Sequence, residues 1–136
     1  MLREDGIALD DGTAARLDEN HFVVTTTTAN AVSVYRHMEF VRQCLYPKMD
    51  VQLISTTEAW AQFAIAGPNS RSVLRKIVDK EYDISNEEFP FMACGQITVC
   101  GGLRARLFRI SFSGELAYEL AVPCLLYTSP SPRDDL

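Results

Sequence analysis

The sequence predicts an α+β fold with a mainly antiparallel sheet and two principal helices. Runs of alternating apolar and polar residues, typical of half-buried strands, occur before, between and after two segments with helical spacing. Several neighbouring strand patterns are joined by tight-turn signals such as Gly101-Gly102, which suit hairpins. With 136 residues, 47% hydrophobic and 23% charged, the chain has the composition of one small globular domain.

The first half is predicted to hold three strands and a long helix. Short strands over Gly6–Asp10 and Thr13–Leu17 are expected around Asp11-Gly12, followed by a strand over Phe22–Thr27. From residue 30 to about residue 46, apolar side chains recur every three or four positions, which indicates an amphipathic helix. The apolar positions of this helix are Val32, Tyr35, Met38, Val41 and Leu45.

The second half is predicted to hold a shorter helix among further strands. Gly67-Pro68-Asn69-Ser70 is expected to open a helix that runs to about Val78, because proline suits an early helical position. The expected strands are Asp50–Ser55, Trp60–Ala66, Gln96–Cys100 and Leu103–Phe112, the last two forming a hairpin.

The segment Phe108–Pro123 reads as strand, tight turn at Ser113-Gly114, and strand. Side chains alternate along a strand, so Glu115 and Glu119 should share one face, opposite an apolar face. A carboxylate held there could accept two parallel N–H bonds from a flat heterocycle with an amino group beside a ring N–H, as in a pterin. The alternative is a half-buried strand whose glutamates face water.

Charge and composition argue against several classes of partner. The net charge of −5 and the pI near 5.0 predict no nucleic-acid partner. No apolar run approaches the roughly 20 residues that span a bilayer, and the start lacks a signal-peptide pattern, so no membrane association is expected. Four cysteines without a C-x-x-C pair and two histidines predict neither a metal site nor disulfides, which favours a cytoplasmic protein.

The last residues do not continue the preceding pattern. Residues 124–136 contain two Ser-Pro steps and no hydrophobic periodicity. The string L-L-Y-T-S-P-S-P-R-D resembles the translation of a sequencing adapter. We therefore expect a partial domain over residues 1–123 and a non-biological tail over 124–136. An authentic proline-rich linker is the alternative.

Five separated blocks, in order, resemble one protein family. They are M-L-R-E-D-G-I-A-L-D-D-G-T-A-A-R-L, H-F-V-V-T-T-T-T-A-N-A, I-A-G-P, E-E-F-P-F-M and F-R-I-S-F-S-G-E-L-A-Y-E-L. Together they resemble the folate-binding, aminomethyltransferase-like region of heterotetrameric sarcosine oxidase alpha subunits, which is similar to the glycine-cleavage T-protein. The likeness spans residues 1–123, so the resemblance implies a partial aminomethyltransferase-like folate-binding fold.

The resemblance implies a role in one-carbon transfer. In this family tetrahydrofolate accepts the carbon released by sarcosine oxidation, giving 5,10-methylenetetrahydrofolate and glycine, while hydrogen peroxide forms at a flavin site elsewhere. FAD, FMN and NAD are expected only in other parts of the complex, since this chain has no G-x-G-x-x-G motif. Other sarcosine oxidase subunits are the implied partners, and this fragment alone is expected to be inactive.

Other functions stay open at this point. One alternative is a glycine-cleavage aminomethyltransferase or a dimethylglycine-oxidising relative, which would share the folate chemistry. Another is a non-catalytic folate-binding or subunit-interaction module.

The resemblance also implies candidate site residues. The family motif places a transfer carboxylate in the pair Asp10-Asp11. Because adjacent strand residues face opposite ways, only one of the two should point into the site. We expect Asp11 to be catalytic, with Asp10 as second choice. Read without the family, Asp-Asp-Gly is a hairpin turn. Glu119 matches the pterin anchor, and Glu115 either assists it or is solvated.

Other residues have weaker indications. Thr27 and Asn30 are candidate ligand-lining residues at the entry to the first helix. Trp60 is expected to be a core or loop anchor rather than a stacking platform. Phe112 stands where aminomethyltransferase relatives often have tyrosine, an exchange that keeps packing and removes a hydroxyl.

Overall fold

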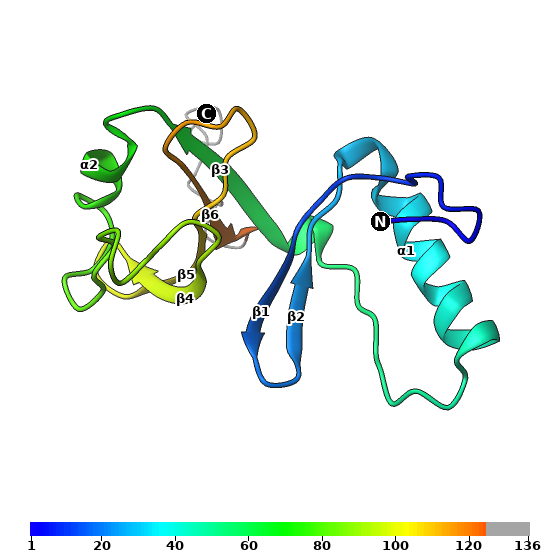
Figure 1. The fold of residues 1–136 in the computed structure, drawn as a ribbon. Coiled ribbons are helices and arrows are strands. Elements are labelled where there is room, and N and C mark those ends of the chain that lie inside the picture. The colour runs from blue at the N-terminus through cyan, green and yellow to red at the C-terminus, as the bar shows by residue number, and fades with distance from the viewer. Residues whose placement is uncertain (125–136) are drawn as a thin grey trace, which may run out of the picture. The chain divides into compact units, whose positions relative to one another are not determined.

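A computed structural model of the chain describes residues 1–124. These residues form two compact units, Met1–Thr57 and a second unit that begins at Glu58 (Figure 1). All strand pairs among the described residues are antiparallel, and helices are few. The predicted α+β class with a mainly antiparallel sheet is therefore confirmed.

The first unit combines a β-hairpin with the long helix. Strands β1 (Ala14–Asp18) and β2 (His21–Val24) pair with a bulge between Arg16 and Asp18. A short turn, η1 (Thr28–Asn30), leads into α1 (Ala31–Phe40), whose last part continues as the π-helical segment η2 (Val41–Leu45). The helix predicted from apolar spacing is thus confirmed, although its final turn is wider than an α-helix.

The predicted strand over Gly6–Asp10 is wrong. The chain turns back within its first residues, where the N–H of Arg3 donates to the carbonyl of Ile7 and Gly6 adopts a φ of +78°. Only an isolated bridge between Leu2 and Ala8 results. Consequently Thr13–Leu17 pairs with residues after it rather than before it, and Asp11-Gly12 is not a hairpin turn.

The second unit is built on a four-stranded sheet in the order β3-β6-β5-β4. A 3-10 turn, η3 (Thr57–Ala59), leads into β3. The strands are β3 (Trp60–Ala66), β4 (Cys94–Val99), β5 (Leu103–Phe108) and β6 (Ala117–Pro123). Strand β6 comes last in the sequence among the described strands, but it lies inside the sheet, between β3 and β5.

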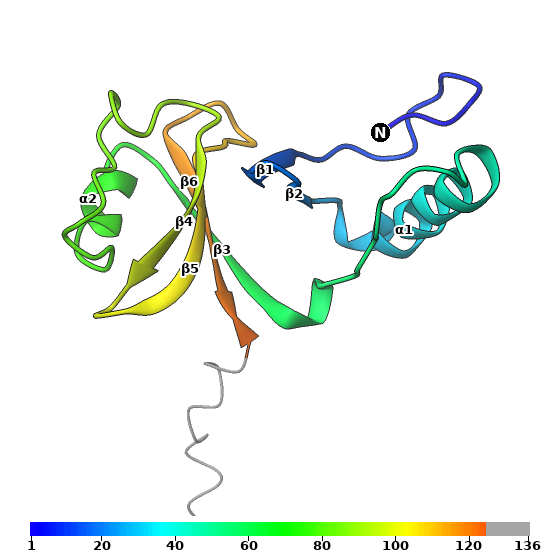
Figure 2. The same ribbon diagram turned by 90° about the horizontal axis from the view of Figure 1, so that it is seen from below.

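One face of this sheet carries the hydrophobic core. Tyr118, Leu120 and Leu107 are almost fully buried, and Leu107 is paired with Leu120 across strands β5 and β6. Helix α2 (Ser70–Leu74) lies on this side of the sheet, as Figure 2 shows, and Leu74 belongs to the same cluster. The core therefore fixes which way every side chain of β6 points.

Three predicted elements of the second half differ from the structure. Helix α2 ends before Val78, because that residue leaves the helix to bridge Val99 of β4. Residues 50–55 form no strand, since no described strand pairs with them. Strand β5 ends at Phe108, and an eight-residue loop, 109–116, replaces the predicted tight turn before β6.

The proposed tail, residues 124–136, falls almost wholly outside the described residues. Only Cys124 is described, and it is half-buried. The division into a domain over 1–123 and a non-biological tail stays a prediction.

Candidate functional site

The Asp10 carboxylate is held by three donors from the entry to the first helix. Its Oδ1 accepts from the hydroxyl of Thr27 at 2.8 Å and from the side-chain amide of Asn30 at 3.2 Å. Its Oδ2 accepts from the N–H of Thr27 at 2.8 Å. Asp10 is 9% exposed. The structure thus joins three residues that the sequence suggested separately.

Hydrogen bonding keeps the Asp10 carboxyl ionised. Burial tends to raise its pKa, but the bonds from Asn30 and from the N–H and hydroxyl of Thr27 together outweigh burial, so its pKa lies below the ordinary value. The backbone N–H of Asp11 also contributes to lowering the pKa of Asp10. A carboxylate has about four acceptor positions, so this one is enclosed by donors from its own neighbourhood.

Asp11 lies in a different environment. It is exposed, and its Oδ1 accepts from the N–H of Gly12 at 2.8 Å. No side chain among the described residues forms a hydrogen bond or an ion pair with the Asp11 carboxylate. The two candidate transfer carboxylates therefore differ: Asp10 is enclosed and oriented by its neighbours, whereas Asp11 makes only a local turn contact.

Gly12 brings β1 against the segment that holds Asp10. A side chain on Gly12 would place its Cβ 2.0 Å from the carbonyl oxygen of Thr25, far inside contact distance. Thr25 in turn bonds Thr13 through its N–H at 2.8 Å and through its hydroxyl. This close backbone approach sets the position of Thr27, two residues further on.

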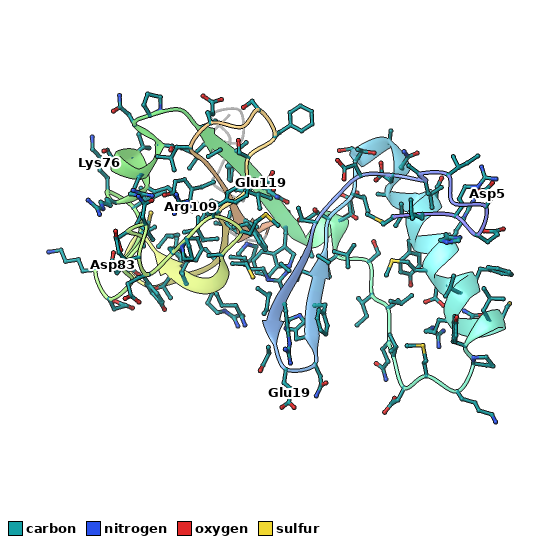
Figure 3. The ribbon with its side chains drawn as sticks, viewed as in Figure 1. Asp5, Glu19, Lys76, Asp83, Arg109 and Glu119 are labelled. Atoms are coloured by element: carbon teal, nitrogen blue, oxygen red, sulfur yellow. The ribbon has the colours of Figure 1, made fainter. Side chains whose placement is uncertain are left out.

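Glu119 lies on the face of the second unit's sheet that is opposite the core (Figure 3). Strand β6 alternates as predicted: Tyr118 and Leu120 enter the core, and Glu119 points the other way and is half-buried. Gln62 of β3 donates its side-chain amide to Oε2 of Glu119. That bond restrains Oε2, and no hydrogen bond to Oε1 is found among the described residues.

Glu115 does not share this environment. It lies in the loop before β6, is exposed, and accepts the hydroxyl of Ser113 at 2.7 Å. The prediction that it lies on the same strand face as Glu119 is wrong, because the strand begins only at Ala117. Phe112, in the same loop, is fully exposed.

Two residues of this face were not identified as site residues from the sequence, and a third residue was expected to have a different role. Gln62 and Arg106 were not singled out, and Trp60 was expected to pack as an anchor. In the structure the guanidinium of Arg106 lies over the Trp60 ring, 3.9 Å from its centroid, and Trp60 is not in the core cluster. Alternation along β3 places Trp60 and Gln62 on one face, and the strand register puts that face on the side of Glu119, with Trp60 opposite Pro123 and Gln62 opposite Ala121.

The candidate residues fall into two groups that belong to different units. Asp10, Thr27 and Asn30 lie in the first unit; Glu119, Gln62 and Arg106 lie in the second. Among residues 1–124, no set of three or more His, Cys, Asp or Glu side chains is arranged to hold a metal ion, and no described helix is long and apolar enough to cross a membrane.

Comparison with known proteins identifies the family. Residues 1–125 match the GCVT N-terminal domain. The chain belongs to this family. It is 60% identical over 124 residues, 90% of its length, to the sarcosine oxidase subunit alpha of Rhizobium meliloti (strain 1021), and covers 12% of that protein.

More distant members of the family differ in name and share less sequence. The mitochondrial sarcosine dehydrogenase of Homo sapiens is 41% identical over 76 residues, which are 56% of this chain and 8% of that protein. The aminomethyltransferase of Clostridium botulinum (strain Okra / Type B1) is 26% identical over 122 residues, which are 88% of this chain and 30% of that protein. The chain thus spans a small part of each of these relatives.

Proposed function

We propose that this chain forms part of a folate-dependent one-carbon transfer domain within a sarcosine oxidase alpha subunit. The 60% identity to a sarcosine oxidase alpha subunit, against 26% to an aminomethyltransferase, favours the sarcosine type. In this proposal tetrahydrofolate accepts the carbon from oxidised sarcosine to form 5,10-methylenetetrahydrofolate, glycine being the other product. Hydrogen peroxide would form at a flavin held elsewhere in a cytoplasmic, multi-subunit complex.

The observation that carries the proposal is the oriented carboxylate of Glu119. A pterin presents a ring N–H beside an amino group, and a carboxylate matches that edge with two parallel acceptors. Gln62 donates to one oxygen of Glu119, which lies on strand β6, while the carboxylate stays partly accessible. The donor and acceptor chemistry of these residues fits tetrahydrofolate, which when bound would supply the amine nitrogens that take up the carbon.

The transfer carboxylate is the second part of the proposal. We expected Asp11 from the sequence, but its exposure and local contact support Asp10 in its place. The pKa of Asp10 lies below its ordinary value, so the carboxyl group is ionised at neutral pH. A negative charge held there could stabilise a cationic iminium and orient the nitrogen that attacks it. Thr27 and Asn30 act as positioning residues for Asp10.

The test compares Asp10→Asn with Asp11→Asn in the longer subunit that contains this segment. Single-turnover formation of 5,10-methylenetetrahydrofolate should fall by about 100-fold or more in Asp10→Asn, which is the range for loss of a positioned acid–base or electrostatic group. Asp11→Asn should stay within a few-fold of wild type. Tetrahydrofolate binding measured on the same samples controls for folding.

Two results would contradict this assignment. If Asp11→Asn loses transfer and Asp10→Asn keeps it, the catalytic residue is the one expected from the sequence. If both variants transfer at the wild-type rate and bind tetrahydrofolate normally, neither Asp10 nor Asp11 takes part in the transfer.

A further inference from the structure

The face of the second unit's sheet that carries Glu119 also carries Arg106, whose Nε has no hydrogen-bond partner among the described residues. Arg106 on β5 is paired with Ala121 of β6, which lies two residues from Glu119. Residues two apart on a strand point to the same face, so Arg106 and Glu119 face the same side, with Cα atoms about 7–8 Å apart diagonally. This geometry involves the second unit alone.

Arg106 is held in place but is not satisfied. Its guanidinium carbon lies over the Trp60 ring, and because Trp60 is paired with Pro123 whereas Arg106 is paired with Ala121, the Arg106 side chain extends across β6. Its Nε is a buried nitrogen without a hydrogen-bond partner, the one such side-chain atom found among residues 1–124. Leaving a buried donor unpaired costs free energy, and for a charged group the cost is larger. Because Nε itself is enclosed, an acceptor on a ligand would be bound by the terminal nitrogens of the guanidinium.

We propose that Arg106 donates a hydrogen bond to the 4-oxo group of the pterin ring that Glu119 holds, which makes it a second anchor of the same ligand. This inference rests on the proposed function. When a carboxylate takes the amino group and the ring N–H of a pterin, the next ring position carries the 4-oxo oxygen, which is a pure acceptor. A planar cation with several N–H groups matches that acceptor, and it offers nothing to the donors that Glu119 takes.

The position of Arg106 selects the ring rather than the tail of folate. The 4-oxo oxygen lies beside the edge that Glu119 would bind, whereas the tail carboxylates lie beyond the pterin and the aminobenzoyl ring. Because Arg106 and Glu119 are diagonal neighbours on adjacent strands, the nearer acceptor is the one within reach. Stacking on Trp60 keeps the guanidinium pre-organised, so less side-chain freedom is lost on binding.

The experiment measures binding of two ligands by anaerobic isothermal titration calorimetry on the longer subunit. The ligands are tetrahydrofolate and a tetrahydropterin that carries a methyl group in place of the tail. The variants are Arg106→Met, Arg106→Lys and the matched control Arg104→Met, which removes the same charge from the same strand face at an exposed position. Thermal melting checks the folding of each variant.

Arg106→Met should weaken both ligands by the same factor, about 10- to 100-fold, which is the range for a hydrogen bond to a charged group. Arg106→Lys should recover part of the affinity, because it keeps the charge and the apolar stem, and Arg104→Met should change neither ligand by more than about twofold. If Arg106→Met has a lowered melting temperature, Arg106→Lys alone tests the inference. Loss of the planar guanidinium should still weaken the binding of both ligands equally.

Other outcomes would overturn the inference in distinguishable ways. Weaker binding of tetrahydrofolate alone would assign Arg106 to the tail carboxylates. Unchanged binding of both ligands in a folded Arg106→Met would leave Arg106 a purely structural partner of Trp60. If the wild-type subunit binds neither ligand, the proposed function itself fails.

Discussion

Replacement of Gly12 by alanine tests how the first unit positions Asp10. The new Cβ would lie 2.0 Å from the carbonyl oxygen of Thr25, whereas ordinary contacts begin near 3.4 Å, so the Thr25 backbone must move by more than 1 Å. That movement breaks the three hydrogen bonds between Thr13 and Thr25. At about 0.5–1.5 kcal/mol each, their loss should destabilise this contact by roughly 2–4 kcal/mol.

Native-state hydrogen exchange measures this effect locally, even within a longer subunit. The amides of Thr25 and Thr27 should exchange at least about 30-fold faster in Gly12→Ala, since each 1.4 kcal/mol is a factor of ten. Methylene transfer should fall in parallel, because Thr27 supplies two of the three bonds to Asp10. Gly95→Ala is the matched control, because its new Cβ would meet nothing closer than 3.8 Å.

The reasoning would be refuted by normal protection of both threonine amides in Gly12→Ala. A loss of protection without any loss of transfer would refute a narrower point. In that case the hydrogen bonds from Thr27 would not be what positions the carboxylate.

Two further predictions concern the second unit. Tyr118→Phe removes the buried hydroxyl that accepts from Nε of Arg71 at 2.8 Å, and should lower the free energy of opening of β6, measured by hydrogen exchange, by about 1 kcal/mol; no change would mean that water replaces the bond. Asp79 has a lowered pKa through the hydroxyl of Thr98 and the N–H groups of the Gly101-Gly102 turn. Its stabilisation is therefore complete above the unfolded pKa of about 3.9 and is lost as pH falls through the lower folded pKa. The protection of the β4 amides against hydrogen exchange should therefore decrease as pH falls, and Asp79→Ala should make this decrease smaller. An unchanged decrease would contradict the prediction.

Local patterns in the sequence predicted the elements whose stability is local or whose faces are clearly amphipathic. The helix now seen over Ala31–Leu45 follows from its apolar spacing, and the alternation in β6 correctly placed Glu119 opposite the core. Both depend on the side-chain period alone. The antiparallel character of the sheet also followed from short connections such as Gly101-Gly102.

What could not be predicted depends on contacts between segments far apart in the chain. Residues 50–55 have strand-like composition but find no described partner strand, and β-propensity without a partner does not make a strand. Asp10 and Asp11 are indistinguishable by pattern; the donors that set them apart come from Thr27 and Asn30, 17 and 20 residues away. Arg106 and Gln62 share the sheet face of Glu119 only through the register of β3, β5 and β6.

The central claim is that Glu119 anchors the pterin of tetrahydrofolate. Calorimetric titration of tetrahydrofolate against the longer subunit and its Glu119→Gln and Glu115→Gln variants tests it most directly. Glu119→Gln keeps the shape of the side chain but replaces one acceptor with a donor, so affinity should fall about 10- to 100-fold. Glu115→Gln, in the exposed loop, should bind as wild type does. Wild-type affinity in Glu119→Gln, or an equal loss in both variants, would contradict the account.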